Sequence, residues 1–430
     1  MQVSDITAAD SSADNQKIVV EVTDEWTLEL VKKIIEAKQV TGKCNIIPVK
    51  VNEVLGQILS QFCLMPELNS AYSELFSNRG AEFHSEQHEN DDEIAFVKKY
   101  FKNHNHALPI TVMENNGQSY AFYVADNDKD VHKKSTVEKS DYSVSLNKNY
   151  WMERKNVVIL GHNSKCKHIM AGFEAFSNEW RHGSEEIVRI IVIDDKKSLE
   201  KMNYYKDYPF VIETVEADIY DKDIICSTID SFVSSNEQDT SVLILSDDSA
   251  LNEDIDASAL ANLVYVRDII TKKKNENPDF DLESIDVIVE IIDPKHHDIV
   301  NSYSVNNVVI SNRYISKMIT QISEYEALFD FYNDILSYDE GQSEEYNSKE
   351  IYIKKVTRYF DEIPEETTAD KLVRAIYNDS IDEKRMGFVN PTIALGYVKQ
   401  GGELKIFGGD LSQIKVRLEE KDKLVLFTAH

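Results

Sequence analysis

Residues 156–176 read NVVILGHNSKCKHIMAGFEAF, and their types and order could hold an anion. An apolar run ends in Gly161, polar residues follow, and apolar residues then recur at helical spacing. A strand, a tight turn and a helix N-terminus in this order hold the phosphates of dinucleotides in many α/β proteins. The dinucleotide fingerprint also needs glycines at positions 163 and 166, where this chain has Asn163 and Cys166. The fingerprint is therefore degraded, and NAD or an adenine nucleotide stays one of several candidate ligands.

Polar residues also follow three further apolar runs. Asp194 and Asp195 end one run, Asp218 follows the next, and Ser246 follows the third. The carboxyl ends of parallel strands meet at one edge of a sheet, where open α/β sheets bind ligands. A second interpretation stays open, in which Gly161 only makes the turn and the carboxylates cap helices. The predicted ligand-binding residues are Gly161, Asn163, Asp194, Asp195, Asp218 and Ser246.

The stretch SDDSALNEDIDA (246–257) carries enough carboxylates to suggest a cation site. Calcium prefers six to eight hard oxygen ligands, and Ca²⁺ is the preferred candidate ligand of this chain. Acids in a loop also commonly form a solvated face, and no EF-hand supports the calcium interpretation. Residues 126–138 fail as an EF-hand because Val131 stands where glycine is needed. The predicted metal ligands are Asp247, Asp248, Glu253 and Asp254.

No enzyme motif accompanies these residues. The sequence has no G-x-S-x-G elbow, no Walker loop and no H-E-x-x-H helix. His84 and His88 lie four apart, but the residues between them do not match the zinc-protease pattern. We therefore expect structural roles for the histidines and no catalysis.

Composition limits the partners. The chain has 430 residues and a formal net charge of -29, which argues against non-specific binding to nucleic acid or to an anionic membrane surface. No apolar run approaches the ~20 residues that span a bilayer. The four cysteines are scattered, as is typical of reduced thiols. These features favour a cytoplasmic protein.

The pattern of apolar runs predicts the elements that position these residues. From residue 155 six apolar runs alternate with helical patterns, which predicts an α/β fold with a Rossmann-like, doubly wound parallel sheet. A long helical stretch (312–337) would cross over to a small α+β unit. The predicted units are a Rossmann-like part with its crossover helix at 155–338 and an α+β subdomain at 348–430.

An internal repeat links the two ends of the chain. KIVVEVTDEWTLELV (17–31) matches DVIVEIIDPKHHDIV (286–300) in pattern, with Glu21 opposite Glu290. NIIPVKVNEVLGQILSQ (45–61) likewise matches NVVISNRYISKMITQ (307–321). The chain would thus begin with a flexible leader (1–16), continue with the back half and crossover helix of a first module (17–78), and complete that module with a small subdomain and linker (79–150). The front half of this first copy is expected to be absent.

Five segments carry a resemblance to a known family: VVILGH (157–162), SVLILSDDS (241–249), SALANLVYVRDI (258–269), VIVEIIDPKHHDIV (287–300) and NVVISNRYISKMI (307–319). Their order and spacing resemble the RCK (regulator of K⁺ conductance) modules of potassium channels and of Trk/Ktr uptake systems. The chain is most similar to the cytosolic gating-ring region of CASTOR/POLLUX-type ion channels. The resemblance implies a ring-type homo-oligomer attached to a membrane pore, with calcium regulation in some members.

Three functions follow as expectations. The first is a cytosolic regulatory domain of a cation or potassium channel that senses a small ligand such as Ca²⁺ and couples binding to gating. The alternative is an NAD(H)- or nucleotide-sensing subunit of a Trk/Ktr-type potassium uptake system, and the third is a Rossmann oxidoreductase.

Apolar residues at helical spacing in the two crossover segments suggest a packing surface. Packing within one chain explains them, while the resemblance implies packing between modules and subunits. The predicted interface residues are Leu55, Ile58, Phe62, Ile315, Met318, Ile319 and Ile322.

Overall fold

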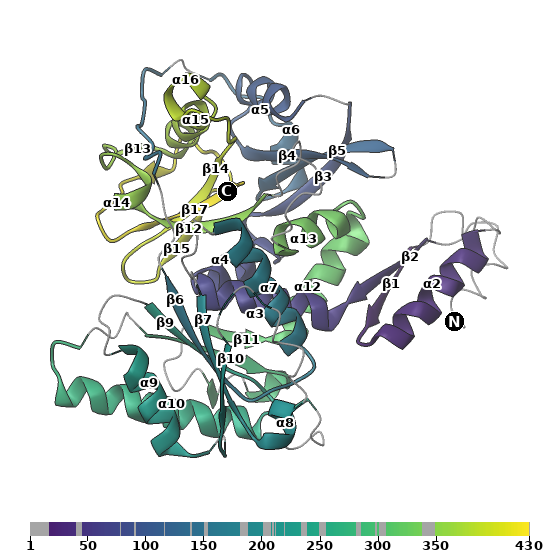
Figure 1. Cartoon of the computed structure of the whole chain (residues 1–430). Coiled ribbons are helices and arrows are strands. Elements are labelled where there is room, and N and C mark those ends of the chain that lie inside the picture. Colours follow the sequence, from purple (N-terminus) through teal and green to yellow (C-terminus); the bar gives the residue numbers. More distant parts are fainter. Residues whose placement is uncertain are drawn as a thin grey trace.

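In the computed structural model, a parallel sheet forms one end of the molecule, small sheets with helices form the other, and helix pairs lie between them (Figure 1). Among the described residues, no helix is long and apolar enough to cross a bilayer. The structure describes residues 17–39, 45–77, 79–89, 92–115, 117–137, 140–149, 154–180, 188–200, 208, 210, 212–218, 220–233, 239–248, 255–280, 285–296, 299–300, 307–337 and 349–429.

Six parallel strands form the large sheet. Its order is β11 (Asn307–Ile310), β10 (Ile285–Ile291), β9 (Asp239–Ile244), β6 (Lys155–Leu160), β7 (Val188–Asp194) and β8 (Ile212–Glu216). All neighbouring strands run parallel. The chain runs outward from β6 to β8 and then restarts at β9 on the other side of β6. The prediction of a doubly wound, Rossmann-like sheet is therefore confirmed, and its topological switch point lies between β6 and β9.

Helices cover both faces of this sheet, which explains why its strands are almost continuously apolar. Val157 and Ile159 of β6 belong to the core on one face, and Val158 and Leu160 belong to the core on the other. The helices of this unit are α7 (Cys166–Trp180), α8 (Lys196–Glu200), α9 (Lys222–Val233), α10 (Ala257–Glu276) and the short 3-10 helix η3 (Pro294–His296).

The N-terminal part of the chain forms a smaller set of elements. Strands β1 (Lys17–Val22) and β2 (Asn45–Lys50) pair in parallel, with α2 (Glu25–Gln39) between them in sequence. They project from the body of the molecule (Figure 1). Helices α3 (Val51–Leu64) and α4 (Leu68–Leu75) follow, and then a three-stranded antiparallel sheet in the order β3-β5-β4. The bounds of the last elements are β3 (Glu82–His88), α5 (Glu93–Phe101), β4 (Ala107–Asn115), β5 (Gln118–Ala125) and α6 (Asp128–His132).

The C-terminal part begins in the same way, with two parallel strands and a helix pair before an antiparallel sheet. After β10 and β11 come α12 (Ser311–Glu324) and α13 (Leu328–Ser337), and then an antiparallel sheet in the order β12-β17-β14-β15. The elements of this subdomain are β12 (Glu350–Lys355), α14 (Val356–Tyr359), β13 (Thr367–Thr368), α15 (Ala369–Ser380), α16 (Glu383–Met386), β14 (Ile393–Val398), β15 (Leu404–Ile406), β16 (Lys415–Val416) and β17 (Lys423–Thr428).

The two parts also correspond residue by residue. Glu21 pairs with Val49 across β1 and β2, and Glu290 pairs with Val309 across β10 and β11. Asn52 Nδ2 donates to the Thr23 carbonyl at 2.8 Å, and Asn312 Nδ2 donates to the Ile292 carbonyl at 3.0 Å. Helices α3 and α12 that follow both have 14 residues. A parallel strand pair followed by a helix pair therefore occurs twice among the described residues.

The two helix pairs, α3–α4 and α12–α13, pack against each other in one core. Phe62 of α3 contacts the ring of Tyr314 in α12, and Phe76, which follows α4, contacts the ring of Tyr332 in α13. All seven predicted interface residues lie in this core or pack against it. Packing between subunits stays a prediction.

Candidate functional site

The turn between β6 and α7 lies at the switch point of the large sheet. Gly161 has a φ of 89°, a conformation that side-chain-bearing residues rarely adopt. Its N–H donates to the Ile193 carbonyl of β7 at 3.1 Å, and on the other side Leu245 N–H donates to the Leu160 carbonyl at 3.0 Å. The turn is thus held between the ends of β7 and β9, where a crevice is expected.

Asn163 fills the inside of this turn. Its side-chain amide donates to the Ser246 carbonyl at 3.0 Å and to Glu290 Oε2 at 2.8 Å. Its Oδ1 accepts the N–H of Lys165 at 3.0 Å, and its own N–H points at Cys166 Sγ, 3.3 Å away. The two residues that replace fingerprint glycines are therefore both buried structural members of the turn.

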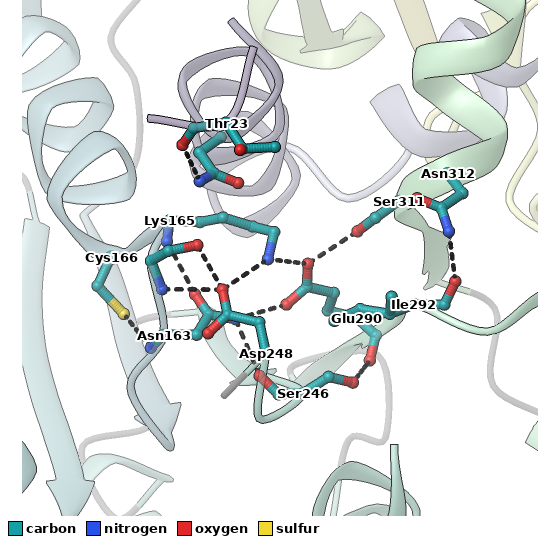
Figure 2. Close-up of polar contacts among 12 residues, drawn as sticks. Thr23, Asn163, Lys165, Cys166, Ser246, Asp248, Glu290, Ile292, Ser311 and Asn312 are labelled. Carbon is teal, nitrogen blue, oxygen red and sulfur yellow. Dashed lines mark hydrogen bonds and ion pairs between the residues drawn. The ribbon is translucent and has the colours of Figure 1, made fainter. Parts of the chain in front are cut away.

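The carboxylate of Asp248 lies at the start of α7, at the position where a nucleotide phosphate would bind. It accepts the Ser164 N–H at 3.1 Å and the Ser164 hydroxyl, and it lies 3.5 Å from Lys165 Nζ (Figure 2). Helix N-termini attract negative charge because their first N–H groups lack partners within the helix. The chain thus supplies its own anion here, and a pyrophosphate at these donors would compete with Asp248.

A second carboxylate, Glu290 of β10, is fully buried beside the turn. It accepts hydrogen bonds from Asn163 and from the Ser311 hydroxyl at 2.8 Å, and Lys165 Nζ lies 3.1 Å away (Figure 2). Burial alone would lower the pKa of Lys165, but Glu290 and Asp248 outweigh it, so this pKa is raised. Lys165 is therefore a charged link between two acids. In the first copy the matching Glu21 is exposed.

Asp256, directly before α10, is a buried acceptor for several groups near the turn. Although buried, it accepts the N–H groups of Ile292 and Asp293 at 2.9 Å, His296 Nδ1 at 2.8 Å and the Ser246 hydroxyl at 2.7 Å. Burial raises the pKa of this carboxyl, but the four hydrogen bonds prevail and its pKa lies below the usual value. The carboxylate therefore lies between the Ser246 hydroxyl and the imidazole of His296 and contacts both.

The other predicted ligand-binding acids mainly cap local structure. Asp194 is buried and accepts the N–H of Asp195 at 2.6 Å. Asp195 accepts the N–H of Ser198 at 2.8 Å in α8, and Asp218 accepts the N–H of Tyr220 at 2.9 Å. These contacts agree with the interpretation in which carboxylates cap turns and helices. Of the predicted ligand residues, the structure gathers Gly161, Asn163 and Ser246 around one turn.

The predicted metal ligands do not come together in the described part of the chain. Asp248 is bound to Ser164 and Lys165, and the Asp247 N–H donates to the Ile255 carbonyl at 3.2 Å. Glu253 and Asp254 lie outside the described residues. Within the described ranges, no three His, Cys, Asp or Glu side chains form a group that could hold a metal ion. The four-residue calcium set stays a prediction.

Sequence reasoning missed Ser164 and Glu290 as site residues. A signal existed for Glu290, because an acid within an otherwise apolar strand at the same place as Glu21 indicates a buried partner. Nothing in the order of residues indicates that Asp248 binds the start of α7, since 83 positions separate it from Lys165.

No protein-family model and no curated protein matches the chain. Among solved structures it is similar to the GsuK channel, at 10% identity and a TM-score of 0.30, over 97% of this chain and 61% of that one. It is also similar to the GsuK RCK domain, at 9% identity and a TM-score of 0.31, over 96% of this chain and 72% of that one. The GsuK channel bound to NAD matches at 10% identity and a TM-score of 0.30, over 96% and 60%. The chain thus spans about three fifths of the channel's length.

Proposed function

We propose that this chain is a cytosolic regulatory domain of a cation or potassium channel, without catalytic activity, in which a ligand at the crevice changes how the two copies pack. The observation that carries the proposal is the position of α7. Ser164 and Lys165, directly before this helix, bind Asp248, and the helix itself packs directly against α3 of the other copy.

The contact between α7 and α3 is too close for ordinary side chains. A Cβ added to Gly172 would lie 2.1 Å from Ser60 Oγ, and one added to Gly56 would lie 2.5 Å from the Cβ of His168. Since close-packed interiors transmit displacement rather than absorb it, a shift of α7 must move α3. The small residues therefore let α7 and α3 pack closely and move together, which couples the crevice to the first copy.

A contact between α3 and α13 would transmit a displacement of α3 to the second copy. Gln61 of α3 donates its side-chain amide to the carbonyls of Ile335 at 3.1 Å and Leu336 at 3.3 Å, at the end of α13. A ligand that binds better when Asp248 leaves the start of α7 would favour one arrangement of this chain of contacts. Such a difference in affinity between two arrangements is the physical requirement for regulation by a ligand.

Ca²⁺ is the ligand we propose, because the sequence from 246 to 257 is rich in oxygen donors and Asp248 of this stretch lies beside the start of α7. A ring-type homo-oligomer attached to a membrane pore completes the proposal. An NAD(H)- or nucleotide-sensing subunit of a Trk/Ktr-type uptake system is the alternative, and it requires a pyrophosphate to displace Asp248 from α7.

Calorimetric titration of the chain with Ca²⁺ and with NADH tests both. We expect saturable Ca²⁺ binding that is lost in the double variant Asp247→Asn with Asp248→Asn. It should persist in the matched control Asp268→Asn with Glu276→Gln, which removes two charges from the surface of α10. Hydrogen exchange should change in α7 and α3 upon binding. Binding of NADH alone favours the alternative, and binding that leaves α7 and α3 unchanged contradicts the proposed coupling.

A further inference from the structure

A second cleft, of about 920 Å³, lies between the two copies and is distinct from the crevice. It is lined by α4, by the exposed face of α12 and by the loop that precedes β15. Its charged residues are Arg79, Arg313, Lys317 and Glu74, and hydroxyl side chains such as Ser73 and Thr320 surround them. Clefts of this volume accommodate small-molecule ligands.

The charge of this cleft opposes that of the chain. The chain has 76 acidic and 47 basic residues, yet the described residues that line this cleft include three cations and one acid. Arg313 and Lys317 stand four residues apart on one helix, where like charges destabilise each other. Burial and the neighbouring Arg313 both lower the pKa of Lys317, whose ammonium group donates to the Ser73 carbonyl at 2.5 Å. In the described part of the chain, no carboxylate forms an ion pair with these three cations.

The internal repeat shows that the fold does not require this charge. The equivalent cleft, of about 890 Å³, lies between α3, α13 and β4 and is also lined by α7. At the positions that match Arg313 and Lys317 it has Glu53 and Gln57. At those that match Ser70 and Glu74 it has Asp330 and Asp334. One architecture therefore carries opposite charge in its two copies, and the basic copy needs an explanation of its own.

We propose that the basic cleft binds a small phosphate-bearing metabolite. Two guanidinium groups can each form paired hydrogen bonds with phosphate oxygens, and Lys317 adds a third positive charge. The surrounding hydroxyls can donate to the remaining oxygens. The bound anion would also remove the repulsion between Arg313 and Lys317. Because the cleft joins α4 of one copy to α12 of the other, its ligand would hold the two helix pairs together.

Calorimetry of the full chain with inorganic pyrophosphate, at constant ionic strength, tests this site. We expect saturable binding that weakens at least tenfold in Arg313→Gln with Lys317→Gln. Glu74→Gln should strengthen it several-fold by removing the one carboxylate of the cleft. The matched control Lys50→Gln with Lys272→Gln, which removes two cations elsewhere, should bind as the wild type does. Asp248→Asn should also bind pyrophosphate as the wild type does, because Asp248 lies at the crevice and not in this cleft.

Thermal unfolding shows whether the double variant folds, and we expect its melting temperature to equal or exceed that of the wild type because the repulsion is gone. Three outcomes overturn the proposal: no saturable binding by the wild type, equal weakening in the control, or equal competition by sulfate and pyrophosphate. Failure of Ca²⁺ binding at the crevice leaves these outcomes unaffected.

Discussion

Gln61 and Gln321 occupy the same position in two equivalent helices and make reciprocal contacts. Gln61 Nε2 donates to the last carbonyls of α13, and Gln321 Nε2 donates to the carbonyls of Leu75 and Ser77 at the end of α4, at 3.2 and 3.4 Å. Each side-chain oxygen accepts a tyrosine hydroxyl, from Tyr72 in one copy and Tyr332 in the other. The helix pairs are therefore joined by two matching polar contacts within an apolar core.

Replacing either glutamine with leucine should weaken the chain to a similar extent. Each change leaves a tyrosine hydroxyl and helix-terminal carbonyls buried without partners, which costs about 1–3 kcal/mol for each unsatisfied group. Urea unfolding of Gln61→Leu and Gln321→Leu measures the loss, and Gln413→Leu, at an exposed position, serves as control with a change below about 0.5 kcal/mol. A loss in only one of the two variants contradicts the equivalence of the contacts.

Gly172→Ala should force α7 away from α3. The added Cβ would meet both Oγ and Cβ of Ser60, at 2.1 and 2.9 Å, and overpacking of this kind typically costs about 1–3 kcal/mol. Gly401→Ala is the control because nothing lies within 4 Å of its added Cβ. Thermal unfolding measures stability, and hydrogen exchange of the α3 amides measures how tightly α3 packs against α7. Equal melting temperatures for the two variants would show that the helices separate without cost.

The parallel sheet could be predicted from the sequence because its strands are buried on both faces and so form unbroken apolar runs. The repeat was visible because Glu21 and Glu290 stand at matching places in two apolar runs. The contacts of Gly56 with His168 and of Gly172 with Ser60 could not be predicted, because a small residue indicates a close neighbour but not which residue that neighbour is.

The residues of the crevice could likewise be predicted only in part. Gly161, Asn163 and Ser246 follow strand ends, and the parallel order of strands is enough to place them near each other. The role of Asp248 depends on the path of the loop after β9, which no local pattern encodes. The path of this loop decides whether the turn after β6 is free to bind a phosphate or binds a carboxylate of its own chain.

The free energy of unfolding should decrease at acid pH as Asp256 becomes protonated. Its pKa is lowered in the folded chain, so its contribution is present above the unfolded value of about 3.9 and is lost as pH falls through the folded value. Urea unfolding of the wild type and of Asp256→Asn should differ by about 2 kcal/mol or more at pH 6, and the difference should shrink below about pH 4. Asp218→Asn, at an exposed turn, should show little difference at either pH. A difference for Asp256→Asn that persists to pH 3 contradicts the argument.

Lys165→Met should be among the most destabilising single changes in the crevice. It leaves Glu290 buried without its cation, and breaking a buried pair in this way costs about 3–5 kcal/mol. Since the pKa of Lys165 is raised, its contribution is fully present below the unfolded value of about 10.4 and is lost only as pH rises through the folded value. The loss measured by urea unfolding should therefore be constant from pH 6 to 9.

The control Lys222→Met breaks an exposed pair with Asp268 and should cost less than about 1 kcal/mol. Adding Glu290→Gln to Lys165→Met should restore part of the loss, because the remaining side chain no longer carries an unpaired charge. A double variant less stable than Lys165→Met would show that Lys165 acts through Asp248 instead.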